Sequence, residues 1–176
     1  LALPHLRRAV EYTPRNVDIE MLLAYCLKEM RYTTESSSIA ENVLGVFPGY
    51  LPALNLIGLN SLEINDLNRA IRAFETSYEL QPHQEATKVK LGYSYLKFAQ
   101  ELRMRNFFKE AYETEEKLFE LQPESAETLL RMIVDQATLK NHNKAQELYE
   151  QLPNTYVDPR KYYTRAKMMI AKEDIF

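Results

Sequence analysis

The sequence contains little glycine and cysteine: its 176 residues include four glycines, one cysteine and no tryptophan. So few glycines leave little material for tight β-hairpins, and no Gly-rich nucleotide-binding motif is present. The single thiol, Cys26, excludes an internal disulfide framework but fits both the cytoplasm and a bacterial periplasm. No apolar run reaches the roughly 20 residues that span a bilayer. The chain does not begin with Met, and we expect it to be a fragment of a longer protein.

An excess of basic residues is also missing. The chain has 22 Lys and Arg against 25 Asp and Glu, which gives a formal charge of −3. Neutralisation of nucleic-acid phosphates is therefore not expected, and we predict no nucleic-acid partner. With 45% hydrophobic residues the chain can bury a core, and its many Leu, Glu, Ala, Lys and Gln residues favour helices.

The prolines are regularly spaced. Pro14, Pro48 and Pro82 follow one another at a constant interval, and Pro123 comes after a longer one. The longer interval exceeds the others by about seven residues, or two helical turns, so the register is extended rather than lost. A constant interval of this size predicts an internal repeat.

Small residues recur in phase with the prolines. The twelfth residue before each proline is small, and one more period reaches a further alanine: Ala2, Ser36, Ala70, Ala111 and Ala145. Gly58 and Gly92 are also separated by one period. Glycine inside a helix costs about 1 kcal/mol relative to alanine, so we expect a close approach of a neighbouring helix there. Each unit reads as two amphipathic helices, with polar turn residues such as Asn65 and Asn106 between them.

These features resemble the tetratricopeptide repeat, a helix-turn-helix unit of about 34 residues with a small residue in each helix, an aromatic residue in the second and a closing proline. In residues 51–84, the residues Gly58, Ala70, Phe74 and Pro82 match the signature. In the following unit Glu115 stands where the family has an aromatic residue. The flanking units match less well: Ala40 takes the aromatic place in the first, and Ile133 replaces the usual glycine in the last.

The resemblance implies an all-α fold: a right-handed superhelical solenoid of antiparallel helix pairs, forming one domain over residues 1–176. The expected repeats are residues 17–50, 51–84, 85–125 and 126–157, with half-units at 1–16 and 158–176. The extra residues near 97–103 are expected to lengthen one hairpin, either by neutral drift or as a docking ridge. A last helix is expected from Asp158, as N-cap, to about Lys172.

In such a stack the first helix of each unit lines the concave groove. The residues expected to bind a partner there are Met21, Tyr25, Asn55, Leu59, Leu62, Val89, Lys90, Tyr93, Leu96, Leu130 and Val134. Two interpretations remain open. The rows are partly buried between helices, or they anchor an apolar or amphipathic segment of a partner, with Asn55 and Lys90 fixing its backbone or a carboxylate. The Lys and Asn pattern that clamps the C-terminal carboxylate of heat-shock chaperones is not matched, since only Lys90 is basic.

Two further clusters of residues are considered for structural or functional roles. The apolar residues Tyr156, Tyr162, Tyr163, Met168, Met169 and Ile170 either cap the stack or support self-association through the C-terminal helix. The acidic residues Glu110, Glu113, Glu115, Glu116 and Glu120 are expected to form a solvated face of one helix.

No catalytic constellation is visible. His5, His83 and His142 have no partner at ligand spacing, and Cys26 has no nearby His. We therefore predict a non-catalytic scaffold or adaptor without metal or cofactor, which binds another polypeptide. The alternatives are a regulatory or substrate-positioning segment of a larger enzyme, and an assembly factor in bacterial secretion or envelope biogenesis.

Overall fold

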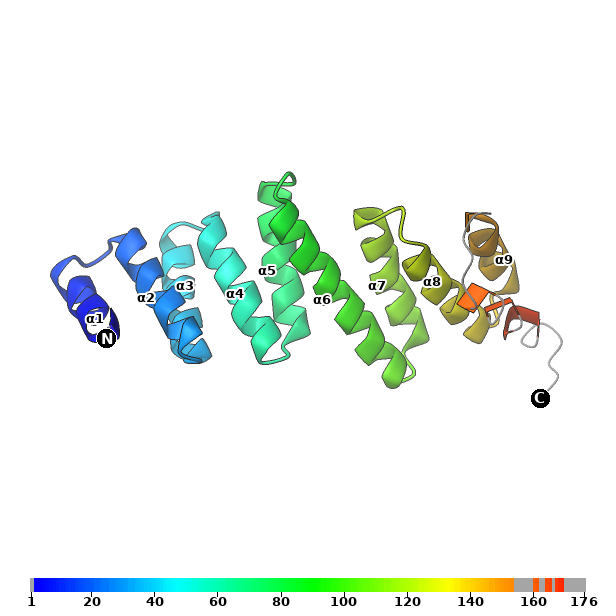
Figure 1. Cartoon of the computed structure of the whole chain (residues 1–176), viewed down its shortest axis with the longest axis horizontal. Helices are drawn as coiled ribbons and strands as arrows, with labels where there is room; N and C mark the ends of the chain where they lie inside the picture. Colours follow the sequence, from blue (N-terminus) through cyan, green and yellow to red (C-terminus); the bar gives the residue numbers. More distant parts are fainter. Residues whose placement is uncertain (1, 154–159, 162–163, 166, 170–176) are drawn as a thin grey trace. The chain divides into compact units, whose positions relative to one another are not determined.

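The computed structural model describes residues 2–153, 160–161, 164–165 and 167–169. In this part of the chain the secondary structure is helical, without a strand, which confirms the predicted all-α class (Figure 1). The helices are α1 (Ala2–Tyr12), α2 (Val17–Glu29), α3 (Thr33–Val46), α4 (Leu51–Glu63), α5 (Leu67–Leu80), α6 (Glu85–Met104), α7 (Phe108–Leu121), α8 (Ala126–Thr138) and α9 (His142–Glu150).

Backbone contacts divide the chain into two compact units, Leu1–Ser94 and Tyr95–Phe176, with the boundary inside α6. The expectation of one continuous domain over residues 1–176 stays a prediction.

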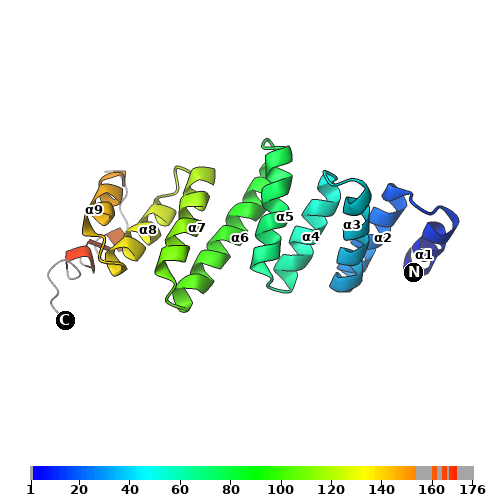
Figure 2. The same ribbon diagram turned by 180° about the vertical axis from the view of Figure 1, so that it is seen from behind.

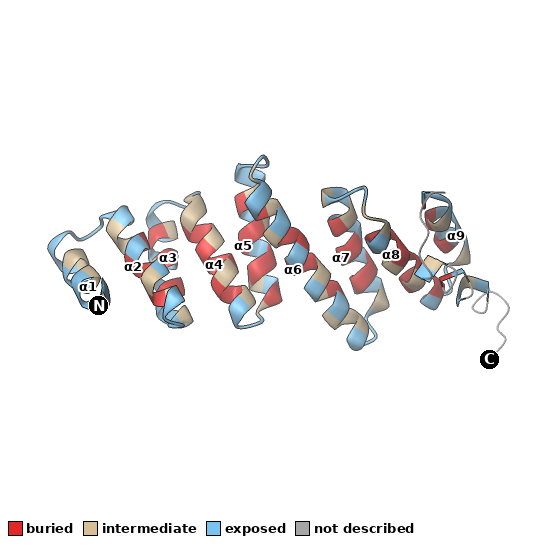
Figure 3. Ribbon diagram, viewed as in Figure 1, coloured by how far each residue is buried: buried red, intermediate tan, exposed pale blue. Residues whose placement is uncertain are grey.

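Unit 1 contains α1 to α5 and the beginning of α6. Successive helices up to α5 pack against each other in alternating directions, and α2 also contacts α4 (Figures 1 and 2). One core cluster comprises Met21, Ala24, Ala40, Val43, Ala53, Leu56, Ile57 and Ala73. The buried positions recur on one side of each helix from α2 onward, whereas α1 has none (Figure 3). Ala2, the first member of the small-residue series, is exposed.

The small residues lie where helices approach closely. Ser36 and Ala70 have no exposed surface. A Cβ atom built on Gly58 would lie 2.5 Å from the ring of Phe74, a residue that is itself completely buried. Gly58 of α4 therefore makes room for the aromatic ring of α5, as the repeated glycine predicts.

The turns inside the hairpins have one common geometry. Each turn contains one residue in the left-handed conformation, with φ between 58° and 68°: Arg31, Asn65, Asn106 and Lys140. The next residue donates its N–H to a carbonyl five positions back, for example Asp66 to Ser61 at 2.8 Å and Phe107 to Leu102 at 2.9 Å. This is the Schellman motif, which ends a helix by satisfying its last carbonyl groups. It recurs with the period of the prolines, including the one longer interval.

The extra residues of the third repeat stay helical. α6 has 20 residues, whereas α2, α4 and α8 have 13 each. The expectation of two additional helical turns is therefore confirmed, while the docking ridge stays a prediction.

Unit 2 contains the second half of α6, α7, α8 and α9. Its core cluster comprises Tyr112, Leu129, Leu130, Met132, Ile133, Ala137, Ala145, Leu148 and Leu152. In the C-terminal half-unit, the described positions 160–161, 164–165 and 167–169 are helical. The expected ends of this helix, Asp158 and Lys172, lie outside the described residues.

Candidate functional site

In unit 1 the first helices of three successive hairpins form one connected face. The Tyr25 hydroxyl of α2 donates a hydrogen bond to the Pro52 carbonyl of α4 at 3.2 Å. The Thr87 hydroxyl of α6 donates to Asn55 Oδ1 of α4 at 3.2 Å. These contacts place α2, α4 and the start of α6 next to one another, and we call this surface the first-helix face.

Apolar side chains are accessible on the first-helix face. Tyr25, Tyr93 and Val89 are 36%, 48% and 55% exposed. Leu59 and Leu62 are half-buried between them. Tyrosine and aliphatic side chains with this partial exposure have the composition of a protein-binding surface.

Two of the expected groove residues do not reach the surface, which corrects the sequence-based expectation. Met21 is 4% exposed and belongs to the core cluster of unit 1, and Leu130 is 5% exposed and belongs to that of unit 2. Both occupy the same position in their repeats as Asn55 and Val89. Their side chains fill the space between helices and therefore do not contribute to the accessible surface.

Asn55 has a fixed orientation. Its Oδ1 accepts a hydrogen bond from the Ser77 hydroxyl at 3.3 Å and shares the single proton of the Thr87 hydroxyl, at 3.2 Å, with Gln84 Oε1, at 2.8 Å. Because the oxygen is engaged, the amide group presents its Nδ2 donors at the other end. Lys90 of α6, the residue after Val89, is half-buried. Burial, and secondly the nearby Tyr50, raises the pKa of Tyr25, which keeps this phenol neutral.

The corresponding residues of unit 2 are less exposed. Leu96 on α6 and Val134 on α8 are half-buried. Only part of each of these side chains is therefore accessible to a partner.

A buried charged cluster in unit 2 was missed by the sequence-based reasoning. Glu115 was expected on a solvated acidic face, but it has no exposed surface, so that expectation is wrong for this residue. The available signal was its place in the repeat, where Phe74 stands in the preceding unit. A side chain at this position points into the core, whatever its polarity.

Arginines from two helices surround the buried carboxylates. Arg103 of α6 binds Asp135 of α8 through two hydrogen bonds, of 2.7 and 2.9 Å, and lies 2.5 Å from Glu115 Oε2 of α7. Arg131 of α8 donates to Glu115 Oε1 at 2.8 Å. Asp135 is also completely buried. Two buried anions are therefore balanced by two cations, as a low-dielectric interior requires.

Burial dominates the ionisation of these carboxyl groups. Loss of hydration raises the pKa of Glu115, although Arg103 and Arg131 oppose the shift. The pKa of Asp135 is raised for the same reason, against the attraction of Arg103. Both groups therefore take up protons more readily than they would in water.

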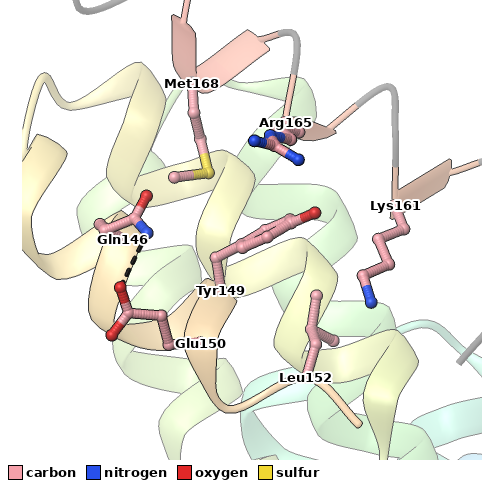
Figure 4. Close-up of a pocket in the computed structure, with 7 residues that line it drawn as sticks. All are labelled: Gln146, Tyr149, Glu150, Leu152, Lys161, Arg165 and Met168. Carbon is pink, nitrogen blue, oxygen red and sulfur yellow. Dashed lines mark hydrogen bonds between the residues drawn. The ribbon is translucent and has the colours of Figure 1, made fainter. Parts of the chain in front are cut away.

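A pocket of about 320 Å³ lies between α9 and the described part of the C-terminal half-unit (Figure 4). Its walls are Gln146, Tyr149, Glu150, Leu152, Lys161, Arg165 and Met168. Met168 packs against the core cluster of unit 2, whereas Met169 is 57% exposed. The other members of the expected C-terminal apolar group, Tyr156, Tyr162, Tyr163 and Ile170, lie outside the described residues.

The described residues hold no group of three His, Cys, Asp or Glu side chains that could bind a metal ion. Among the same residues, no helix is long and apolar enough to cross a membrane.

Comparisons with known proteins reveal similarity in structure only. No protein-family model matches the chain, and no curated protein matches its sequence. A structure of MamA AMB-1 superposes with a TM-score of 0.58 at 15% identity, over 85% of this chain and 78% of that one. MamA from Desulfovibrio magneticus RS-1 gives a TM-score of 0.55 at 17% identity, over 86% of this chain and 81% of that one. Naa15, in a complex titled Naa15/Naa10 bound to HypK-THB, gives 0.64 at 14% identity, over 98% of this chain but 26% of that one.

These neighbours contain tetratricopeptide-like helical solenoids. The regular repeat period, the buried small residues and the recurrent Schellman turns agree with that architecture. The chain therefore has the all-α fold of tetratricopeptide-repeat proteins.

Proposed function

We propose that this chain is a non-catalytic interaction scaffold which binds another polypeptide on the first-helix face of unit 1. The single observation that supports this best is the accessibility of Tyr25 on α2 and of Val89 and Tyr93 on α6, two helices that are each joined to α4 by a direct hydrogen bond. Apolar side chains held on a rigid framework gain binding energy without a large ordering cost. The assembly named in the Naa15 structure, with other chains, is consistent with this role for the fold.

The polar groups suggest how the partner is held. The amide oxygen of Asn55 accepts from the hydroxyls of Ser77 and Thr87, so its Nδ2 protons point away from these two groups. Lys90, next to Val89 in the sequence, adds a half-buried cation. A partner segment would therefore present carbonyl or carboxylate oxygens to Asn55 and Lys90, and apolar side chains to the two tyrosines. The proposed partner is an extended or helical peptide segment of amphipathic character.

The test is affinity capture with the purified chain and with the triple variant Tyr25→Glu, Leu59→Glu, Tyr93→Glu. Partners identified by mass spectrometry are then measured one by one with both proteins. Because hot-spot side chains contribute about 1–2 kcal/mol or more each, we expect the triple variant to weaken binding at least about tenfold.

The matched control changes three other exposed apolar residues of unit 1, Tyr12, Val46 and Leu80, to Glu. These lie at the ends of the second helices and are not part of the first-helix face. Unchanged affinity in this control supports the proposal. Equal loss in both triple variants, or no loss in the first, would place the binding surface elsewhere.

A further inference from the structure

The charged cluster of unit 2 joins three helices through ion pairs in the interior. Arg103, Glu115, Arg131 and Asp135 come from the end of α6, from α7 and from α8. The carboxylate side chains are 0% exposed, and the arginine side chains are 19% and 21% exposed. The guanidinium groups therefore lie between the buried acids and the solvent. Arg131 also contacts Glu127, which in turn meets Arg160.

The fold itself does not require charges at this place. Two periods earlier, unit 1 has Ala40, Leu56 and Asn60 at the positions of Glu115, Arg131 and Asp135. These residues are buried as well, and Asn60 forms neutral hydrogen bonds with the hydroxyls of Ser36 and Ser37. Unit 1 thus packs the same site with apolar groups and an amide.

Arg103 lies near the end of α6, which has 20 residues against 13 in α2 and α4. Counted back from the turn residues Asn106 and Asn65, it stands where the preceding repeat has the half-buried, apolar Leu62. The end of the long helix α6 and the two buried acids therefore form one arrangement, in which Arg103 supplies one of the two cations that balance the carboxylates.

We propose that this cluster is a proton-operated latch, in which ionised Glu115 and Asp135 hold the extended end of α6 against α7 and α8, and their protonation releases Arg103 to solvent while the unit stays folded.

The charge balance explains why protonation would release the arginine. With both acids ionised, the four side chains carry no net charge. After two protons are taken up, the two guanidinium groups remain charged and no longer have anionic partners. Keeping two unpaired guanidinium groups in the interior is costly. Each arginine side chain already has about a fifth of its surface in water, so a side-chain rotation is enough to hydrate its charged group. Burial raises the pKa of both carboxyl groups, so this occurs at a higher pH than it would for exposed acids.

The latch can be observed by amide hydrogen exchange of the whole chain at about pH 7 and about pH 5, corrected for intrinsic rates. We expect protection of residues 97–106 to fall at least about tenfold at the lower pH. The internal control is the α4–α5 turn at residues 60–66, which has the same Schellman geometry and no buried acid; its protection should not change. The helix content by circular dichroism should stay constant.

Two variants make the test specific. Asp135→Asn removes the bidentate partner of Arg103 and should open residues 97–106 already at about pH 7. The combination Arg103→Met, Glu115→Ala, Arg131→Leu, Asp135→Asn copies the neutral site of unit 1 and should abolish the dependence on pH. If the combined variant does not fold, carboxyl ¹³C NMR of the unaltered chain replaces it, since Glu115 and Asp135 must titrate in the same pH range as the loss of protection. Equal protection at both pH values, or the same response in the neutral variant, would overturn the proposal.

Discussion

At the scale of single residues, the close approach of α4 and α5 depends on Gly58. The ring of Phe74 occupies the space where any other residue would have its Cβ. Gly45 provides the contrast, because a Cβ there would meet nothing within 4 Å. The two glycines therefore have different reasons to be in helices.

We predict that Gly58→Ala lowers the free energy of unfolding by about 1–3 kcal/mol, because the buried ring must move in a tightly packed core. The matched change Gly45→Ala should be neutral or stabilising by up to about 1 kcal/mol, since it only removes the flexibility of glycine. Urea denaturation of both variants measures the difference. A Gly58→Ala protein as stable as Gly45→Ala would show that the ring does not confine this position.

At the scale of the helix, the end of α6 carries an arginine in an unusual environment. Arg103 faces two carboxylates with no exposed surface, whereas Arg105, two residues later, is 64% exposed and pairs with Glu101 on the same helix. The energetic consequence of losing each arginine should differ accordingly.

Arg103→Met is expected to destabilise unit 2 by about 3–5 kcal/mol near pH 7, because Asp135 and Glu115 stay buried with an incomplete set of partners. Arg105→Met should cost less than about 1 kcal/mol, as exposed pairs on a helix do. Chemical denaturation monitored by a probe in unit 2 distinguishes the two. Similar costs for both variants would contradict the buried geometry.

The raised pKa values of Glu115 and Asp135 also predict how stability depends on pH. A carboxyl group with a higher pKa in the folded than in the unfolded state binds protons preferentially in the folded state. Its contribution is therefore favourable at low pH and is lost as the pH rises through the folded pKa. Relative to a Glu115→Gln, Asp135→Asn variant, the unaltered chain should gain stability on acidification from neutral pH.

The gain should be about 1.4 kcal/mol for each unit by which the folded and unfolded pKa values differ. Unfolding measured over a series of pH values gives this difference directly. A relative loss of stability on acidification would mean that the arginines, rather than burial, determine the ionisation of the two acids.

At the scale of the whole molecule, much of the fold follows from spacing alone. The prolines and small residues give the period, and the hairpin turns recur with it. The surface is harder to predict, because Met21 and Leu130 share a repeat position with Asn55 and Val89 but lie in the core. Which member of a row is accessible depends on how neighbouring helices meet.

The charged cluster could not be derived from the sequence, because Arg103 reaches Glu115 and Asp135 only after the helices have packed. Glu115 carried a local signal, its aromatic position in the repeat. Its partners lie on other helices, and no spacing rule within one helix connects them.

Net charge leads to a prediction for the whole chain. With a formal charge of −3, we expect no salt-sensitive mobility shift with single-stranded RNA, even at low ionic strength. A basic control protein should shift the same RNA under the same conditions. A shift by this chain that disappears with added salt would contradict the prediction and direct attention to the arginines and lysines of the C-terminal half-unit.

The length of α6 indicates which insertions can lengthen such a hairpin without disturbing its packing. At about 100° per residue, about seven added residues return nearly to the starting direction, so the following helix keeps its old neighbours. An insertion of about five residues would instead rotate every later side chain of the helix by about 140° and expose side chains that were buried. Variants with a longer hairpin should therefore fold when whole heptads are added and should be destabilised by insertions of intermediate length. The length of such a hairpin can thus be changed only in steps of about seven residues.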